Sequence, residues 1–129
     1  MLFSKAQILA AQDRRYEVID VPEWGEGAQV RVRSLTGREL DRFDAGVVNN
    51  GKKMDLDNLT ARLCVAGIVD EAGQPCFDES DVMALGNKSA AALGRCAEKI
   101  RELSGRTKKE MEDIAKNSST IQTADSGSN

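Results

Sequence analysis

The hydrophobic and polar residues of this chain follow two different periods, one after the other. Residues 16–21 and 28–35 alternate, the first segment imperfectly, so that Arg31 and Arg33 fall on one side of the second segment and its valines on the other. Alternation with a period of two predicts half-buried β-strands. Residues 22–27 separate the segments and contain Pro and Gly, so we expect an antiparallel hairpin with a six-residue loop.

Beyond residue 35 the apolar residues recur every three or four positions, which is typical of amphipathic helices. A short helix is also predicted ahead of the hairpin, where Ser4 and Gln7 have the spacing of a capping box. The expected helices begin at or near Ser4, Thr36, Asp57, Asp78, Lys88 and Thr107. The strongest of them is alanine-rich and runs from Lys88 to Leu103.

The order of these elements predicts an α+β protein. An N-terminal antiparallel hairpin is followed by a mainly helical domain, and residues 68–70 and 76–77 add a small second hairpin around a glycine turn. Residues 118–129 are dominated by Ser, Thr, Gly and Asn, and such a composition cannot offset the entropy of ordering. We therefore expect one domain over residues 1–117 and a disordered C-terminal tail over residues 118–129.

Composition narrows the class of protein further. The 129 residues are 40% hydrophobic and only 4% aromatic, which suits a soluble domain with an aliphatic core. No apolar run approaches 18 residues and the N-terminus lacks the pattern of a secretory signal, so neither membrane insertion nor secretion is expected. The net charge is −3 and the basic residues lie near acids, which argues against nucleic-acid binding.

The residues that carry most catalytic chemistry are missing or isolated. Histidine is absent, which removes histidine bases and histidine-ligated zinc. Cys64, Cys76 and Cys96 are odd in number and widely spaced, so we expect them to be small buried residues in a reducing cytosol rather than metal ligands. The acids of residues 78–81 fit helix capping better than calcium binding, and Gly86–Ser89 fits a helix break better than a phosphate loop. No enzyme activity, cofactor or metal is predicted.

Trp24 is the residue that composition singles out. It is the chain's only tryptophan and it lies in the glycine-containing loop of the predicted hairpin. Two interpretations stay open: Trp24 covers the core as a lid, or it is an exposed anchor for another protein, because tryptophan is enriched at binding hot spots.

Several segments resemble the tail assembly chaperones of long-tailed bacteriophages. The similarity extends from about Val18 to Asn117 and rests on turns and helix starts. The segments that carry it are Val21-Pro22-Glu23-Trp24-Gly25, Val30 to Glu39, Phe43, Leu59-Thr60-Ala61-Arg62-Leu63, Val69-Asp70-Glu71-Ala72-Gly73, Phe77 and Asp81 to Ser89.

The resemblance implies a non-enzymatic role in the cytoplasm of the infected bacterial host. Such chaperones bind the tape measure protein, help the tail tube protein polymerise around it, form homo-oligomers and are absent from the mature virion. A programmed frameshift that yields a longer product is common among them, and Ala115-Lys116-Asn117 has residues that a slippery sequence would encode.

A partner-binding surface is therefore the expected functional site. The candidate partner-binding residues are Trp24, Arg31, Arg33, Met83 and Met111, together with apolar helix faces such as that of residues 88–103 if these are not part of the core. The alternative function is a structural virion component, such as a tail tube or head–tail connector subunit. Proteins of that class are usually richer in strands.

Overall fold

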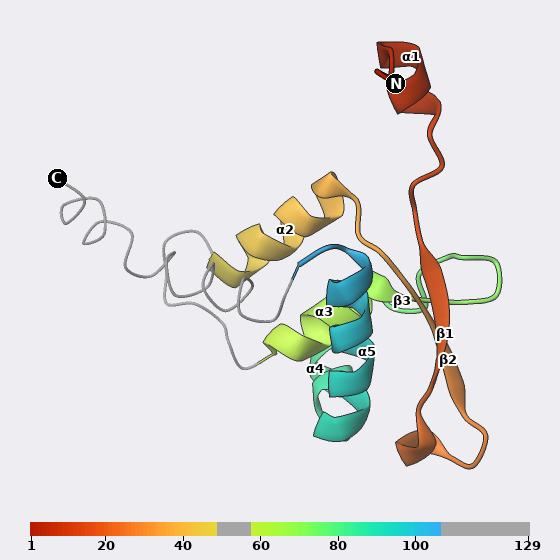
Figure 1. Ribbon diagram of the computed structural model, residues 1–129. Coiled ribbons are helices and arrows are strands. Elements are labelled where there is room, and N and C mark those ends of the chain that lie inside the picture. Colours follow the sequence, from red (N-terminus) through yellow and green to blue (C-terminus); the bar gives the residue numbers. More distant parts are fainter. Residues whose placement is uncertain (49–57, 107–129) are drawn as a thin grey trace, which may run out of the picture.

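The computed structural model describes residues 1–48 and 58–106 of the chain (Figure 1). The elements in chain order are α1 (Lys5–Ala10), β1 (Tyr16–Asp20), the 3-10 turn η1 (Pro22–Trp24), β2 (Gln29–Arg33), α2 (Gly37–Val48), α3 (Leu59–Gly67), β3 (Ile68–Val69), the 3-10 turn η2 (Glu79–Asp81), α4 (Val82–Gly86) and α5 (Ala90–Leu103). A hairpin followed by helices confirms the predicted α+β class. The predicted helix from Thr107, the tail of residues 118–129 and Met111 lie outside the described residues.

The antiparallel hairpin forms with the predicted six-residue loop and carries a third strand. β1 pairs with β2 in antiparallel fashion, with Tyr16 opposite Arg33 and Asp20 opposite Gln29. The amide of Val21 donates to the carbonyl of Ala28 at 2.9 Å, which leaves residues 22–27 as the loop, as predicted. The loop needs its glycines, because φ is +141° at Gly25 and +75° at Gly27, where other residues are strained.

The second hairpin is smaller than the sequence pattern suggests. β3 pairs with β2 as the third strand of the sheet, in the order β1-β2-β3. Its return segment makes an isolated bridge between Val69 and Pro75, and the amide of Cys76 donates to the carbonyl of Ile68 at 3.2 Å. Pro75 lacks an amide hydrogen, which helps to explain why the return does not extend into a strand.

The core lies between the sheet and the two helices α3 and α5, which pack side by side (Figure 1). The apolar face of α5 is buried and consists of Ala92, Leu93, Cys96, Ala97, Ile100 and Leu103. This face therefore belongs to the core and not to a partner-binding surface. Contact between the helices is close at Gly67, where a Cβ atom would lie 2.3 Å from Cδ1 of Ile100.

The structure corrects two expectations about burial. Cys64 and Cys96 are buried as predicted, but Cys76 is exposed because it follows the surface turn of residues 70–75. Arg33 was placed on the polar side of its strand, yet only 9% of its surface is exposed, because its guanidinium packs against Ala66 of α3 and Glu39 of α2. No helix within residues 1–48 and 58–106 has the length and apolar character needed to cross a membrane.

α1 stands apart from this body (Figure 1). The predicted capping box is present: the Gln7 amide donates to Ser4 Oγ at 3.2 Å, and the Ser4 amide donates to Gln7 Oε1 at 2.8 Å. None of the residues of α1 is buried. The helix extends from the start of β1, away from the core.

Candidate functional site

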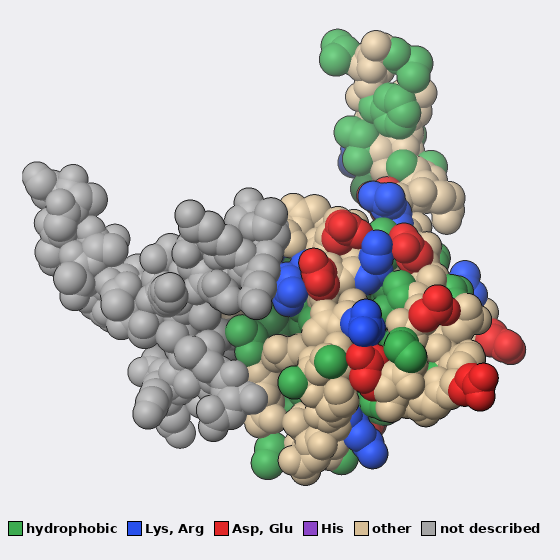
Figure 2. Space-filling view, turned by 60° about the horizontal axis from the view of Figure 1, so that its bottom comes forward, with side chains coloured by type: hydrophobic (Ala, Val, Ile, Leu, Met, Phe, Trp, Pro, Cys, Tyr) green, Lys and Arg blue, Asp and Glu red, His purple; other side chains and the backbone are tan. Residues whose placement is uncertain are grey.

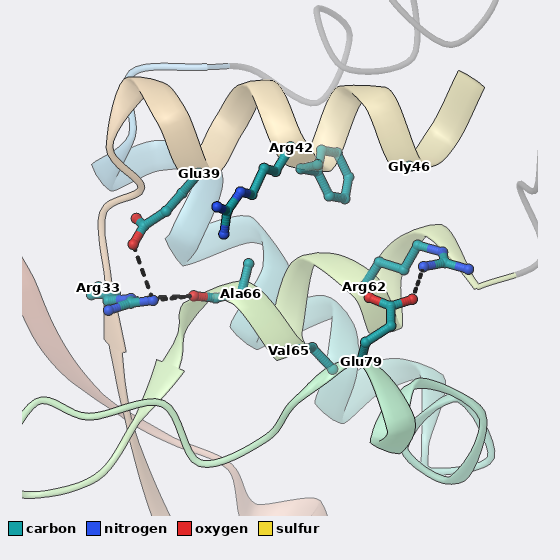
Figure 3. Close-up of a pocket in the computed structure, with 9 residues that line it drawn as sticks. Arg33, Glu39, Arg42, Gly46, Arg62, Val65, Ala66 and Glu79 are labelled. Carbon is teal, nitrogen blue, oxygen red and sulfur yellow. Dashed lines mark hydrogen bonds and ion pairs between the residues drawn. The ribbon is translucent and has the colours of Figure 1, made fainter. Parts of the chain in front are cut away.

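A charged hollow of about 270 Å³ separates α2 from α3 (Figure 3). Its described lining combines five charged residues with a small apolar floor: Arg33, Glu39, Arg42, Arg62 and Glu79, with Phe43, Gly46, Val65 and Ala66. The described lining residues include no serine, threonine, cysteine or tyrosine that could act as a nucleophile.

Arg33 joins three elements inside this hollow. Its Nε and Nη2 donate to the carbonyl of Ala66, at 3.2 and 3.1 Å, and its Nη2 lies 3.3 Å from Oε2 of Glu39. Ala66 is in the last turn of α3, where carbonyl groups lack helical partners and a cation is favoured. Arg33 thus connects the end of β2 to the end of α3 and the start of α2, and its donors serve the fold.

Glu39 pairs with both Arg14 and Arg33, and these three residues form a charged cluster. Its carboxylate accepts from Arg14 Nη2 at 3.0 Å and from the Thr36 amide at 2.8 Å. Burial of the carboxyl group opposes ionisation, but the hydrogen bonds from Arg14 and Thr36 and the positive charges of Arg33 and Arg14 outweigh it. Together they lower the pKa of Glu39 to about 2. The carboxylate is therefore ionised at neutral pH and holds the cluster together.

The remaining acid of the hollow is also engaged. Glu79, from η2, forms an ion pair with Arg62 of α3 (Figure 3). The ion pairs Arg33–Glu39 and Arg62–Glu79 therefore connect elements of the fold across this hollow, and we assign these four charges to its stability.

Two further hollows are mainly apolar, and both are lined by Trp24 and Phe77. The first, the sheet-side hollow, measures about 590 Å³ and is lined by Val18, Trp24, Gln29, Val30, Arg31, Ile68, Val69, Asp70, Glu71, Cys76 and Phe77. The second, the α4-side hollow, measures about 430 Å³ and is lined by Trp24, Phe77, Asp81, Ala84, Leu85 and Lys88. Open apolar hollows with charged rims suit the side chains of a protein partner.

Trp24 is partly lid and partly surface. Its side chain is half-buried and packs against the core, while also lining both hollows. The loop is fixed there because the Trp24 amide donates to the carbonyl of Val21 at 3.0 Å, and Glu23 pairs with Arg95 of α5 at 3.0 Å. Trp24 Nε1 is buried without a hydrogen-bond partner among the described residues. The packing against the core agrees in part with the interpretation of Trp24 as a lid, whereas its role as an anchor for another protein stays a prediction.

The other candidate residues lie in different places. The Arg31 guanidinium lines the sheet-side hollow, 4.9 Å from the centre of the Tyr16 ring, and donates to the carbonyl of Glu71 at 2.9 Å. Met83 is 70% exposed on α4, next in sequence to residues that line the α4-side hollow. Trp24 and Arg31 thus share one hollow, and Arg33 belongs to the charged hollow. Met83 lines none of these hollows, and its Sδ accepts from Asn58 Nδ2 at 3.4 Å.

Sequence reasoning did not identify Phe77 or Val18 as part of this surface. Phe77 was interpreted as the return of a hairpin, but its half-buried ring lies beside Trp24 in both hollows. A large aromatic residue in a chain with only 4% aromatics was the available signal. Val18 is 53% exposed. Its strand alternates imperfectly, so the sequence pattern did not indicate that this apolar residue faces solvent.

Comparison with known proteins finds a shared fold. No protein-family model matches the chain, and no curated protein matches it. A solved structure described as "Structure of bacteriophage HK97 tail assembly chaperone" is similar, with a TM-score of 0.56 and 22% sequence identity. The alignment covers 76% of this chain and 90% of that chain. The resemblance to tail assembly chaperones stated from the sequence is thus matched by the fold.

Proposed function

We propose that this protein is a non-enzymatic tail assembly chaperone. It binds the tape measure protein in the cytoplasm of the infected bacterial host, assists assembly of the tail tube protein, and is absent from the mature virion. The observation that carries the proposal is the fold shared with the HK97 tail assembly chaperone over 90% of that protein's chain. The sequence resemblance rests on turns and helix starts along the chain, and it supports the same assignment.

The α4-side hollow, together with the exposed Met83 on the same helix, is the proposed binding surface for the tape measure protein. Trp24 and Phe77 offer rigid aromatic walls, whereas Met83 offers a flexible and polarisable contact. An apolar groove of this type suits the apolar stripe of a helix, whose side chains at positions i, i+3 and i+4 share one face. Asp81 and Lys88 on the rim provide charges that orient such a helix.

Binding to the tape measure protein tests this surface. Ala84→Asp introduces a charge at an exposed position that lines the hollow, so the fold should be retained while co-purification with the tape measure protein is lost. Ala91→Asp adds the same charge at an exposed position of α5 and serves as the matched control. Equal binding by both variants would remove the α4-side hollow from the proposal.

Mass spectrometry of purified particles tests the assignment as a chaperone. A chaperone is missing from the particles although it is abundant in infected cells. Detection of the chain in particles at a fixed ratio to tail proteins would favour the alternative of a structural virion component, such as a tail tube or head–tail connector subunit.

We also propose that a frameshift near Lys116 produces a longer form. Synonymous recoding of Lys116 and Asn117 removes a slippery sequence without changing the protein. The longer product should disappear from infected cells, whereas an unchanged set of products would contradict the frameshift.

A further inference from the structure

The N-terminal arm, residues 1–10, exposes an unusual amount of apolar surface (Figure 2). Five large apolar side chains belong to it, with exposed fractions of 100% for Met1, 98% for Leu2, 51% for Phe3, 60% for Ile8 and 75% for Leu9. They account for most of the large hydrophobic residues that are exposed in the described parts of the chain. A soluble protein that gathers such residues on one projecting segment usually covers them with another surface.

The arm is helical, yet it is too short to be stable alone. The capping box of Ser4 and Gln7 specifies where α1 begins. However, α1 has only 6 residues, and isolated helices shorter than about 12 residues are marginal in water. A surface that covers Ile8 and Leu9 would supply the missing stabilisation.

The root of the arm is fixed to the body. Arg14 Nη1 donates to the carbonyl of Ser34 at 2.7 Å, and Arg14 also pairs with Glu39. The Arg15 amide donates to Ser34 Oγ at 2.9 Å, and its carbonyl accepts from the Ser34 amide at 2.8 Å. The chain leaves α1 in an extended conformation at Ala11, with φ −64° and ψ 135°. The arm therefore projects from the body, and folding back would require the chain to reverse within residues 11–13.

The sheet-side hollow has the chemistry to receive the arm. Its walls include Trp24, Phe77 and the exposed Val18, which suit the apolar side chains of the arm. Residues 1–12 contain Lys5 but no acid, whereas Asp70 and Glu71 lie on the rim of the hollow. Arg31 brings a positive charge to the same hollow, which is unfavourable for Lys5. Its guanidinium, however, already contacts the Tyr16 ring and donates to the Glu71 carbonyl.

We propose that the N-terminal arm of one copy docks its apolar residues in the sheet-side hollow of a second copy. Because the arm and the hollow are different surfaces of the same chain, the contact is head-to-tail. Contacts of this type form rings when they close and open filaments when they do not. The proposal concerns the protein alone and does not depend on its binding to the tape measure protein.

A mixing experiment tests the contact directly. Ile8→Asp with Leu9→Asp disables the arm but leaves the hollow, whereas Val18→Lys disables the hollow but leaves the arm. Each variant alone should require a protein concentration raised by roughly tenfold or more to associate, because each loses apolar burial at the contact. An equimolar mixture should form a 1:1 complex in light scattering, since one functional arm and one functional hollow remain.

The matched control adds two aspartates at exposed positions of α5, outside both the arm and the sheet-side hollow. Ala90→Asp with Ala91→Asp should self-associate like the unmodified chain. If the unmodified chain is a monomer at every concentration, or if the mixture shows no complex, the proposal is wrong. Circular dichroism of each variant shows whether the fold is intact.

Crosslinking distinguishes docking in a second copy from docking within one chain. Cys76 is exposed and lines the sheet-side hollow, so a short bismaleimide can join it to a cysteine introduced by Leu9→Cys. The expected products are covalent dimers and longer ladders with Leu9→Cys linked to Cys76, and these should vanish when Cys76→Ser is added. A crosslinked monomer would show docking within one chain and would overturn the proposal.

Discussion

The guanidinium of Arg14 holds the carboxylate of Glu39 by two hydrogen bonds, at 2.5 and 3.0 Å. Arg14 lies in the segment between α1 and β1, whereas Glu39 lies in the first turn of α2. The same carboxylate caps α2 through the Thr36 amide and pairs with the buried Arg33. One acid therefore fixes the root of the arm, the end of β2 and the start of α2.

The stability of the protein should depend on pH through Glu39. Its pKa is about 2 in the folded state against an ordinary value of 4.5, so ionised Glu39 stabilises the fold above pH 4.5. That contribution is lost as the pH falls from 4.5 towards 2. Glu39→Gln should cost about 2–3 kcal/mol at pH 7. This is less than the ~3.5 kcal/mol that the pKa difference alone corresponds to, because solvent screens a carboxylate that is 26% exposed.

Urea unfolding between pH 7 and pH 3 measures this effect. The difference in stability between the unmodified chain and Glu39→Gln should shrink as the pH falls. Glu98→Gln, which changes an exposed carboxylate of α5, is the control and should show little difference at any pH. A constant difference across this range would contradict the role given to the charge of Glu39.

Gly67 should tolerate no side chain. A methyl group there would lie 2.3 Å from Cδ1 and 2.6 Å from Cγ1 of Ile100, so Gly67→Ala should destabilise the protein by about 1–3 kcal/mol. At Gly94, in α5, a Cβ atom meets nothing within 4 Å. Gly94→Ala should therefore be neutral or stabilising by up to ~1 kcal/mol, because alanine favours the helix. Thermal melts of the two variants provide the comparison.

Trp24 should contribute to stability by less than a fully buried tryptophan does. Trp24→Ala removes a half-buried ring and should cost about 2 kcal/mol, below the ~3–5 kcal/mol typical of core positions. Trp24→Phe keeps an aromatic wall and removes the unpaired buried Nε1 donor, so it should cost less than about 1 kcal/mol. Chemical denaturation distinguishes the variants, and equal losses for both would mean that the ring is not the stabilising part.

The three cysteines should differ in their reactivity towards maleimide. Cys76 is exposed and should react in the native protein, whereas the buried Cys64 and Cys96 should react only after unfolding. Partial burial and the Asp70 carboxylate raise the pKa of Cys76, so its reaction at pH 7 should be slower than that of a free thiol. Mass spectrometry of the native protein should find one label per chain, and further labels without denaturant would show that the core opens.

The sequence by itself determined the elements whose causes are local. Thr36 and Glu39 form the predicted capping box, and Ser89 caps α5 near the predicted start at Lys88. The antiparallel β1–β2 hairpin also formed with its predicted six-residue loop, because alternation and a short loop restrict the pairing of neighbouring strands. The fold class followed from these elements, whose physics acts over a few residues.

Only the tertiary structure decided which surfaces these elements expose. Alternation placed Arg33 on a polar side, but packing of α2 and α3 buried it, since burial depends on elements that are distant in sequence. The site at Trp24 depends on Phe77, which is brought there by the pairing of β3 with β2. A local pattern specifies a helix or a strand, whereas a hollow forms where separate segments meet and leave space between their side chains.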